Sequence, residues 1–527
     1  MAILLAALAA ATAQTSPGAI LIDRQRIDRA QPATPARAAP RTTTATIGAD
    51  APTTPIVGIR FVGAKAPASV AAAARPFLKR MASRQTLGEL AAALSAAYAD
   101  APVALYSVAI PEQDFAGGVV VVGLTEGRIA TARLAGSAPG AHPLLRRRLA
   151  PLTQEAPLSR ATWERQQSLV QAIPGLTVTS DLTDPEATGA LVLTATPKQK
   201  RTRITAGFSN RGVDLLGAGQ WDAAATLYGA AVDGDQLSLS ASAAADLRAY
   251  RYVSAGYSAP VGADGLTASG SLGYLETRPR GYPVTGHARQ AAASLAYPLV
   301  RSFHRSADIS LGVDGLNSDN AAFGNIVADE RTRAARLAAS MADSRTRREL
   351  SFAAAVSHGI DGLGARVTTP GVRTGFLKGT ASAAASHAIG GRLVARLSAS
   401  AQWTHDPLPA AERFAIGGDT IGRAFDTGLL TGDRGAGGLA ELAYRPFGGG
   451  RLAASELYAF GDGGGVTVLA RDGVPGARYG LASAGIGARA RWHDKAELGL
   501  EGARVVDTPY DGYDERWRVT AAWRLKL

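Results

Sequence analysis

Apolar and polar or small residues alternate in one short run after another from residue 198 to the end of the chain. In one such run Ile309, Leu311 and Val313 are separated by Ser310 and Gly312. Successive side chains of a β-strand point to opposite faces, so each run predicts a strand with one apolar face and one polar face. We count roughly sixteen runs, an even number that is typical of outer-membrane β-barrels.

The connections between these runs differ in length on the two sides of the predicted sheet. Short connections are expected at residues 343–344, 389–391, 447–451 and 492–495, and long ones at residues 317–330, 360–371, 406–435 and 505–515. Bacterial transmembrane barrels have short turns at one end and long loops at the other, an asymmetry that a soluble β-sandwich does not need. The last run alternates from Val519 to Leu527 and is expected to close the barrel. The pattern therefore predicts a mostly β chain with an antiparallel transmembrane barrel over residues 198–527.

A helical period appears only before the barrel, in two units of similar plan. Residues 56–127 and 128–197 each read as strand, helix, helix, strand, strand (βααββ). In the first unit Leu87, Leu90, Ala91 and Leu94 fall on one face of a helix over residues 85–99. Such α/β units can offer a sheet edge to an extended peptide. A pair of inert spacer domains is the alternative.

The N-terminal residues read as targeting and tethering segments. Residues 1–13 are apolar and end in a small-x-small site, which predicts a signal peptide that lacks the usual positive n-region. Residues 14–30 contain a short charged helix, and residues 31–55 form a Pro/Ala/Thr-rich linker that is too poor in large apolar residues to fold. The helix is expected either to plug the barrel as a removable element or to be a frayed terminus.

Composition excludes several classes of protein. The 527 residues contain 60 Gly and no Cys, and only 19% are charged. No apolar run approaches the roughly 20 residues of a membrane-spanning helix. The lack of cysteine excludes zinc ribbons, thiol catalysis and iron–sulfur clusters, and it suits a protein that crosses an oxidising compartment. The net charge of +12 is scattered along the chain, so we expect no nucleic-acid partner.

Motifs for catalysis, cofactors and metals are missing from the sequence. It contains no zinc-protease motif, no nucleophile with supporting glycines and no phosphate-binding loop that ends in Lys-Ser or Lys-Thr. The glycines at 448–450 and 463–465 are interpreted as turns. The seven histidines are scattered without ligand spacing. We therefore expect no enzyme, no catalytic residue, no cofactor and no metal.

One long connection carries the most specific signal. Residues 414–435 read FAIGGDTIGRAFDTGLLTGDRG and contain Arg423, and a later run contains Phe460, Gly461 and Asp462. We predict that the loop folds back into the barrel, where Arg423 pairs with Asp462. A buried arginine needs such a partner, and a carboxylate can bind a guanidinium through two hydrogen bonds. The alternative is an exposed loop cation without contact to Asp462.

These features together resemble the outer-membrane transporters of two-partner secretion, the haemolysin secretion/activation family. The loop motif of that family is a Val-Arg-Gly-Tyr tetrad preceded by Phe-x-x-Gly-Gly. Its partner motif is Phe-x-Asp on the inner wall of the thirteenth strand. The matching loop residues here are Phe414, Gly417, Gly418, Arg423 and Phe425, and the matching wall residues are Phe460, Gly461 and Asp462. Gly422, Ala424 and Phe425 depart from the tetrad, and Leu527 stands where an aromatic residue is usual.

The resemblance implies two periplasmic POTRA domains before a sixteen-stranded barrel in the Gram-negative outer membrane. It implies a secreted, β-rich exoprotein as cargo, unfolded in the periplasm and translocated without ATP. Outer-membrane lipid, periplasmic chaperones and the barrel-assembly machinery are the other implied partners. A barrel-assembly or insertion factor of the same superfamily is the alternative function, and an outer-membrane barrel enzyme is a third.

Overall fold

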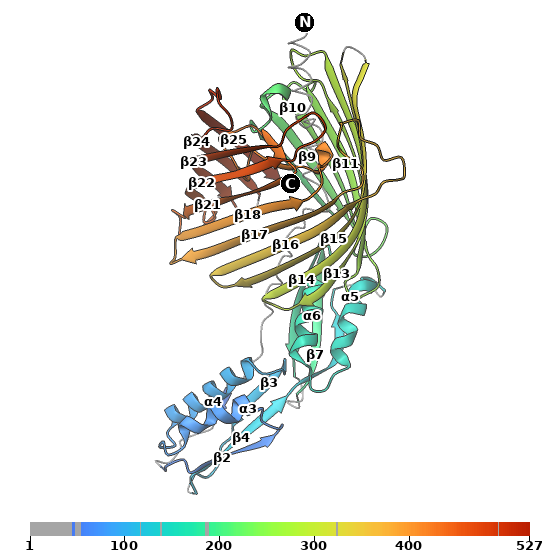
Figure 1. The fold of residues 1–527 in the computed structure, drawn as a ribbon. Helices are drawn as coiled ribbons and strands as arrows, with labels where there is room; N and C mark the ends of the chain where they lie inside the picture. The colour runs from blue at the N-terminus through green and yellow to red at the C-terminus, as the bar shows by residue number, and fades with distance from the viewer. Residues whose placement is uncertain are drawn as a thin grey trace.

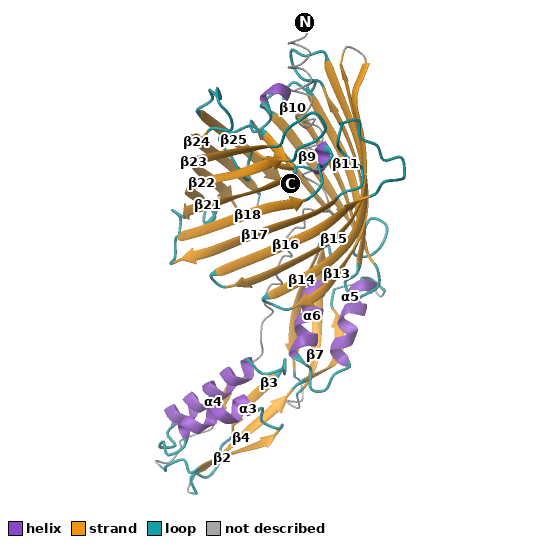
Figure 2. Cartoon of the chain, in the orientation of Figure 1, coloured by secondary structure: helices purple, strands orange, loops and turns teal. Residues whose placement is uncertain are grey.

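The computed structural model describes residues 45–47, 54–115, 117–136, 140–184, 189–322, 325–493 and 495–527. The predicted signal peptide (1–13) and N-terminal helix (14–30) lie outside these residues, so both stay predictions. Two α/β units form an arm below a large barrel, and nearly all of the helix belongs to the arm (Figures 1 and 2). Among the described residues, no helix combines the length and the apolar character needed to cross a membrane.

The barrel is closed and antiparallel, with sixteen strands in the described part of the chain. Each strand pairs with its neighbours in sequence, and β25 closes the barrel on β8. The predicted barrel is therefore confirmed. Its strands are β8 (Thr202–Ser209), β9 (Gln220–Tyr228), β10 (Gln236–Ala244), β11 (Tyr250–Pro260), β12 (Thr267–Thr277), β13 (Val284–Arg301), β14 (Arg305–Ala322), β15 (Asn325–Arg345), β16 (Arg348–Gly359), β17 (Leu377–Ile389), β18 (Leu393–Thr404), β21 (Arg434–Tyr444), β22 (Glu456–Val468), β23 (Ala477–Trp492), β24 (Ala496–Asp507) and β25 (Trp517–Lys526).

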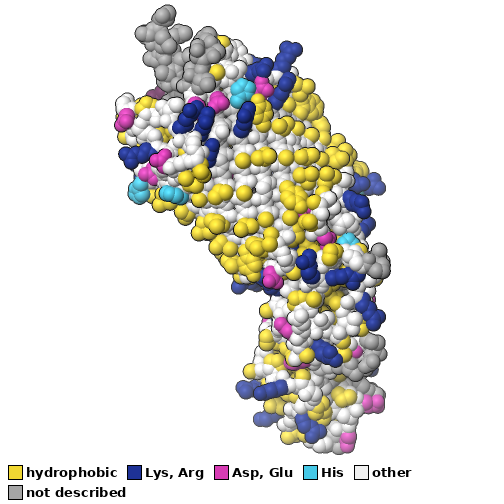
Figure 3. All heavy atoms as spheres, turned by 90° about the vertical axis from the view of Figure 1, so that its right-hand side faces the viewer, with side chains coloured by type: hydrophobic (Ala, Val, Ile, Leu, Met, Phe, Trp, Pro, Cys, Tyr) yellow, Lys and Arg dark blue, Asp and Glu magenta, His cyan; other side chains and the backbone are white. Residues whose placement is uncertain are grey.

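The outer wall of the barrel is apolar because alternate side chains of every strand point outward and most of these are apolar. Leu311, Val313 and Leu397 are more than half exposed, as are many equivalent residues around the wall. On the face drawn in Figure 3, hydrophobic side chains form a broad yellow band over the barrel, with Lys and Arg side chains near its borders. This band is the surface that a bilayer requires.

Three of the predicted connections are wrong. The short connection expected at 447–451 is part of a longer one, because β21 ends at Tyr444 and β22 begins only at Glu456. Residues 317–330 were expected to form a long loop, but β14 continues to Ala322 and β15 begins at Asn325, with Asn317 paired to Arg331. Main-chain hydrogen bonds can extend a hairpin where polar residues replace the apolar alternation, and the period-two signal is then lost. The short turn expected at 343–344 lies at 346–347 instead, because β15 runs through Arg345. The longest connection spans residues 405–433.

The two α/β units confirm the predicted βααββ plan. In the first, Leu87, Leu90, Ala91 and Leu94 are buried on one face of α4 against the sheet, as predicted. The Ser83 hydroxyl caps α4 by accepting a hydrogen bond from the Thr86 N–H at 3.1 Å. Its elements are β2 (Gly58–Gly63), α3 (Ala68–Ala74), η1 (Arg75–Phe77), α4 (Arg84–Ala99), β3 (Tyr106–Ile110) and β4 (Val119–Glu126). Those of the second are β5 (Arg128–Leu134), α5 (Pro143–Leu149), η2 (Ala150–Thr153), α6 (Arg160–Gln171), β6 (Leu176–Thr183) and β7 (Ala190–Gln199).

Part of the expected linker is folded. Strand β1 (Ala45–Ile47) pairs in parallel with β3, so the expectation of an unfolded segment over residues 31–55 is wrong at this point. A strand can join a sheet edge through main-chain hydrogen bonds without contributing an apolar core. The outer edge of β3 is consequently occupied by the chain itself.

The second α/β unit is docked on the end of the barrel. The carboxylate of Asp233, in the β9–β10 turn, accepts a hydrogen bond from the Leu144 N–H of α5 at 2.8 Å. Arg165 of α6 donates to the carbonyl of Asp264, in the β11–β12 connection, and to that of Pro298, near the end of β13. Phe303, between β13 and β14, is buried in the core of the unit. Polar and apolar contacts with three turns therefore hold this unit at the mouth of the barrel.

Candidate functional site

The long loop between β18 and β21 packs against the inner wall of the barrel. It contains the short helix η4 (Ala410–Glu412) and a small hairpin of β19 (Phe414–Ile416) and β20 (Leu430–Gly432). Its tip buries Ile421, Ala424 and Phe425 in one apolar cluster with Phe460 and Leu481 of the wall. The loop therefore has a core of its own, shared with β22 and β23.

Glycines in the wall make room for the loop. Gly463, Gly464 and Gly465 lie inside β22, so their interpretation as a turn is wrong. A Cβ on Gly437 of β21 would lie 2.8 Å from Ile421 of the loop, and one on Gly435 would lie 2.3 Å from Phe414. Side chains here would displace the loop, which explains a glycine-rich pair of strands at this place.

Glycines at the tip provide its backbone shape. Gly417, Gly418 and Gly422 have φ values of +104°, +110° and +80°. A Cβ on Gly417 would also lie 2.3 Å from the carbonyl oxygen of Asp426. The Gly-Gly of the predicted loop motif therefore forms the tight turn that presents residues 422–424 to the wall.

The carboxylate of Asp462 holds the main chain of the tip. One oxygen accepts hydrogen bonds from the Gly422 N–H at 2.8 Å and the Ser483 hydroxyl at 2.6 Å. The other accepts from the Arg423 N–H at 3.2 Å. Phe460 and Asp462 point inward on β22, the thirteenth barrel strand, whereas Gly461 is exposed on the outer face. The two motifs thus meet, but through Asp462 and the loop backbone.

The guanidinium of Arg423 binds two glutamates. Its Nη1 lies 3.0 Å from Glu501 of β24 and 3.4 Å from Glu441 of β21, and its Nε donates to the Asp419 carbonyl at 3.2 Å. It also stacks 4.6 Å above the Phe460 ring. The predicted bidentate pair of Arg423 with Asp462 is wrong, because the side chain turns toward these glutamates while its own N–H reaches Asp462.

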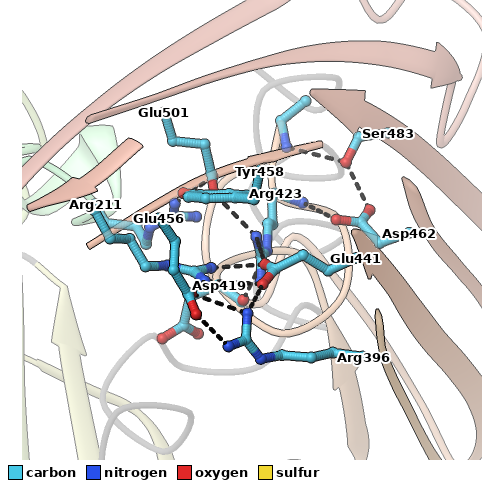
Figure 4. A network of polar contacts seen from close by, with 12 residues as sticks. Arg211, Arg396, Asp419, Arg423, Glu441, Glu456, Tyr458, Asp462, Ser483 and Glu501 are labelled. Carbon is cyan, nitrogen blue, oxygen red and sulfur yellow. Dashed lines mark hydrogen bonds and ion pairs between the residues drawn. The ribbon is translucent and has the colours of Figure 1, made fainter. Parts of the chain in front are cut away.

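The glutamates belong to a wider network that the sequence did not single out (Figure 4). Glu441 binds Arg489 at 2.6 Å and Arg396 at 2.9 Å, and Glu501 accepts from the Tyr458 hydroxyl at 2.8 Å. The remaining members are Arg211, which binds Glu501 at 2.5 Å, and Glu456, which binds Arg396 at 2.6 Å and Arg445 at 3.1 Å. Alternating acids and bases from five strands thus surround the tip.

A second cluster holds the base of the loop. Glu412 of η4 is fully buried and binds Arg336 of β15 at 3.0 Å and Lys378 of β17 at 2.9 Å. Arg336 also pairs with Asp314 of β14. Asp433, at the other end of the loop, accepts from the Leu408 N–H and binds Arg471 at 2.8 Å. The loop is therefore fixed by charged contacts at its base as well as at its tip.

Over the described ranges, no three His, Cys, Asp or Glu side chains gather closely enough to hold an ion. What the arrangement does offer is a folded loop that fills part of a polar lumen and is fixed by side-chain contacts.

Comparisons with known proteins identify the family. The family model described as haemolysin secretion/activation protein ShlB/FhaC/HecB matches residues 189–490, more than half of the chain. The solved structure of CdiB from Escherichia coli is similar, with a TM-score of 0.70 and 18% identity over 98% of this chain and 99% of that one. CdiB from Acinetobacter baumannii gives 0.63 and 17% over 91% of each chain. No curated protein sequence matches.

A third solved structure is similar at a lower TM-score. BamA from Haemophilus ducreyi lacking POTRA domains 1-3 has a TM-score of 0.56 and 14% identity, over 91% of this chain and all of that one. At these identities the three structures share the fold. The family match goes further: the chain belongs to the ShlB/FhaC/HecB haemolysin secretion/activation family, the two-partner secretion transporters of the Gram-negative outer membrane.

Proposed function

We propose that the POTRA-like units capture an unfolded exoprotein in the periplasm and that the barrel translocates it without ATP. The observation that carries this proposal is the loop over residues 405–433. It lies against the inner wall and is held by hydrogen bonds, ion pairs and a small apolar core. Water and a passing polypeptide can replace polar contacts of this kind one by one, so the loop is a removable obstruction.

The capture step is proposed to use a free sheet edge. In the first unit β1 already covers β3, whereas the sheet order β5-β7-β6 leaves β6 at the edge of the second unit. An extended peptide can add to such an edge through main-chain hydrogen bonds, which need little sequence specificity. Because the second unit is docked at the mouth of the barrel, cargo on β6 would be close to the lumen.

Reconstitution into vesicles tests the proposal. The full chain is inserted into liposomes with the POTRA-like units outside, and the exoprotein from the same gene cluster is added unfolded in ATP-free buffer. We expect the exoprotein to become protected from added protease, and the same exoprotein folded beforehand to stay accessible.

The alternative is an assembly factor, which the BamA similarity favours. That function predicts that an unfolded outer-membrane barrel inserts into these vesicles faster than into empty ones. Faster barrel insertion without protection of the exoprotein would contradict translocation.

A further inference from the structure

An open cavity of about 770 Å³ lies in the lumen beside the loop tip. It is lined mainly by β8, β9, β24 and β25, with further residues from β10, β11, β22 and β23, and by Asp419 and Arg423 of the loop. A smaller cavity of about 340 Å³ at the periplasmic end shares Glu497, Arg524 and Lys526 with it. The two cavities are therefore neighbours, and their linings together extend from the β23–β24 connection to the loop tip.

Unpaired positive charge gathers along this space. Arg203, Lys495, Arg524 and Lys526 line it and have no ion-pair partner among the described residues. The other basic residues that line it are neutralised, for example Arg211 by Glu501 and Arg491 by Glu497. The acids there without an ion pair, again within the described chain, are Asp222, which accepts from the Ser242 hydroxyl, and Asp419.

The sheet register places three of these cations side by side. Lys526 of β25 is opposite Thr205 of β8, Arg524 is opposite Gly207, and Arg203 is the next inward residue of β8 beyond Thr205. Like charges next to each other on one face of a sheet destabilise it. The seam between β8 and β25 is paired over only five residues, so repulsion between these cations weakens a short strand pairing.

We propose that the open channel is selective for anions and that this cationic cluster determines the selectivity. An excess of one sign of charge along a cleft concentrates counter-ions there, and rings of Arg or Lys serve this purpose in anion pores. The ligands are small anions such as chloride, bound transiently at the periplasmic mouth. The inference rests on the proposed function only in that the barrel conducts when the loop leaves the wall.

Planar bilayers with a potassium chloride gradient test the inference on the full-length protein. We expect the reversal potential to give a chloride-to-potassium permeability ratio above one. The double variant Arg524→Glu/Lys526→Glu should bring the ratio below one. The matched control Arg251→Glu/Arg289→Glu makes the same charge change on exposed side chains that line neither cavity, and it should leave the ratio unchanged.

Two results would overturn the inference: a wild-type ratio at or below one, or a ratio that the double variant leaves unaltered. If the wild-type protein never conducts ions, the barrel does not open a pore, and that result would contradict the proposed function instead of the selectivity.

Discussion

Replacing Asp462 with alanine is expected to remove most export while the barrel still assembles, because a loop tip without its anchor no longer rests in the one position from which cargo displaces it. The carboxylate accepts from the Gly422 N–H, the Arg423 N–H and the Ser483 hydroxyl, all of them buried. Each donor that is left buried without an acceptor costs about 1–3 kcal/mol. The strands keep their main-chain ladders, so the damage is confined to the loop. Export is measured as exoprotein in the culture medium, and assembly as the heat-dependent shift of the barrel on gels.

Three further variants sharpen this prediction. Leu457→Ala, on the lipid face of the same strand, should export normally. Ser483→Ala removes two hydrogen bonds, one to Asp462 and one from the Ala424 N–H, each worth about 1 kcal/mol, and should lower export less than Asp462→Ala does. The exchange Arg423→Asp/Asp462→Arg should not recover export, because the guanidinium of Arg423 binds Glu501 and Glu441. Recovery by the exchange would show that Arg423 and Asp462 form the direct pair after all.

The second large effect is expected at the base of the loop. Glu412→Ala leaves the buried Arg336 and Lys378 without their shared carboxylate. Breaking a buried ion pair from one side costs about 3–5 kcal/mol. We expect the base to detach, and hence a higher single-channel conductance and a lower melting temperature. Glu349→Ala, which removes an exposed glutamate from β16, is the control and should change neither quantity.

Removing charge from both sides separates this mechanism from general damage. Glu412→Gln/Lys378→Met leaves less unpaired charge than Glu412→Gln alone, so it should regain part of the lost melting temperature. If Glu412→Ala melts and conducts like the wild type, the base cluster does not hold the loop.

Much of the fold could be predicted because a strand that crosses the bilayer must present apolar side chains to lipid at every second position. The odd positions from Leu393 to Trp403 are apolar, and the exposure of Leu393, Leu397 and Trp403 on the outer wall follows directly. The rule fails beyond the bilayer, where water accepts polar side chains on both faces of the β14–β15 hairpin. It also fails at Gly463 to Gly465, because a strand glycine and a turn glycine look alike until the loop that packs on them is known.

The candidate site could be predicted only in part. The loop motif led to Arg423 and Asp462, but several acids point inward from neighbouring strands, and the sequence does not tell which of them a guanidinium reaches. Glu441 and Glu501 occupy inward positions of alternating runs, and this inward position is the one feature of the sequence that could have marked them as partners of Arg423. Glu412 lies in a loop without any period, so nothing in the local sequence distinguishes it from a solvated charge.

Movement of the loop during export is tested most directly by locking its tip to the wall. The Ala424 N–H donates to the Ser483 hydroxyl oxygen at 3.3 Å, so the tip contacts the wall here, and the chain has no cysteine of its own. Ala424→Cys/Ser483→Cys is therefore used to lock the tip, and formation of its one disulfide is checked by the loss of both free thiols. Each single-cysteine variant accounts for the change of side chain alone. We predict that the oxidised double variant exports almost nothing and that a reductant restores export to the level of the single variants. Undiminished export by the fully cross-linked protein would contradict a loop that must leave the wall for cargo to pass.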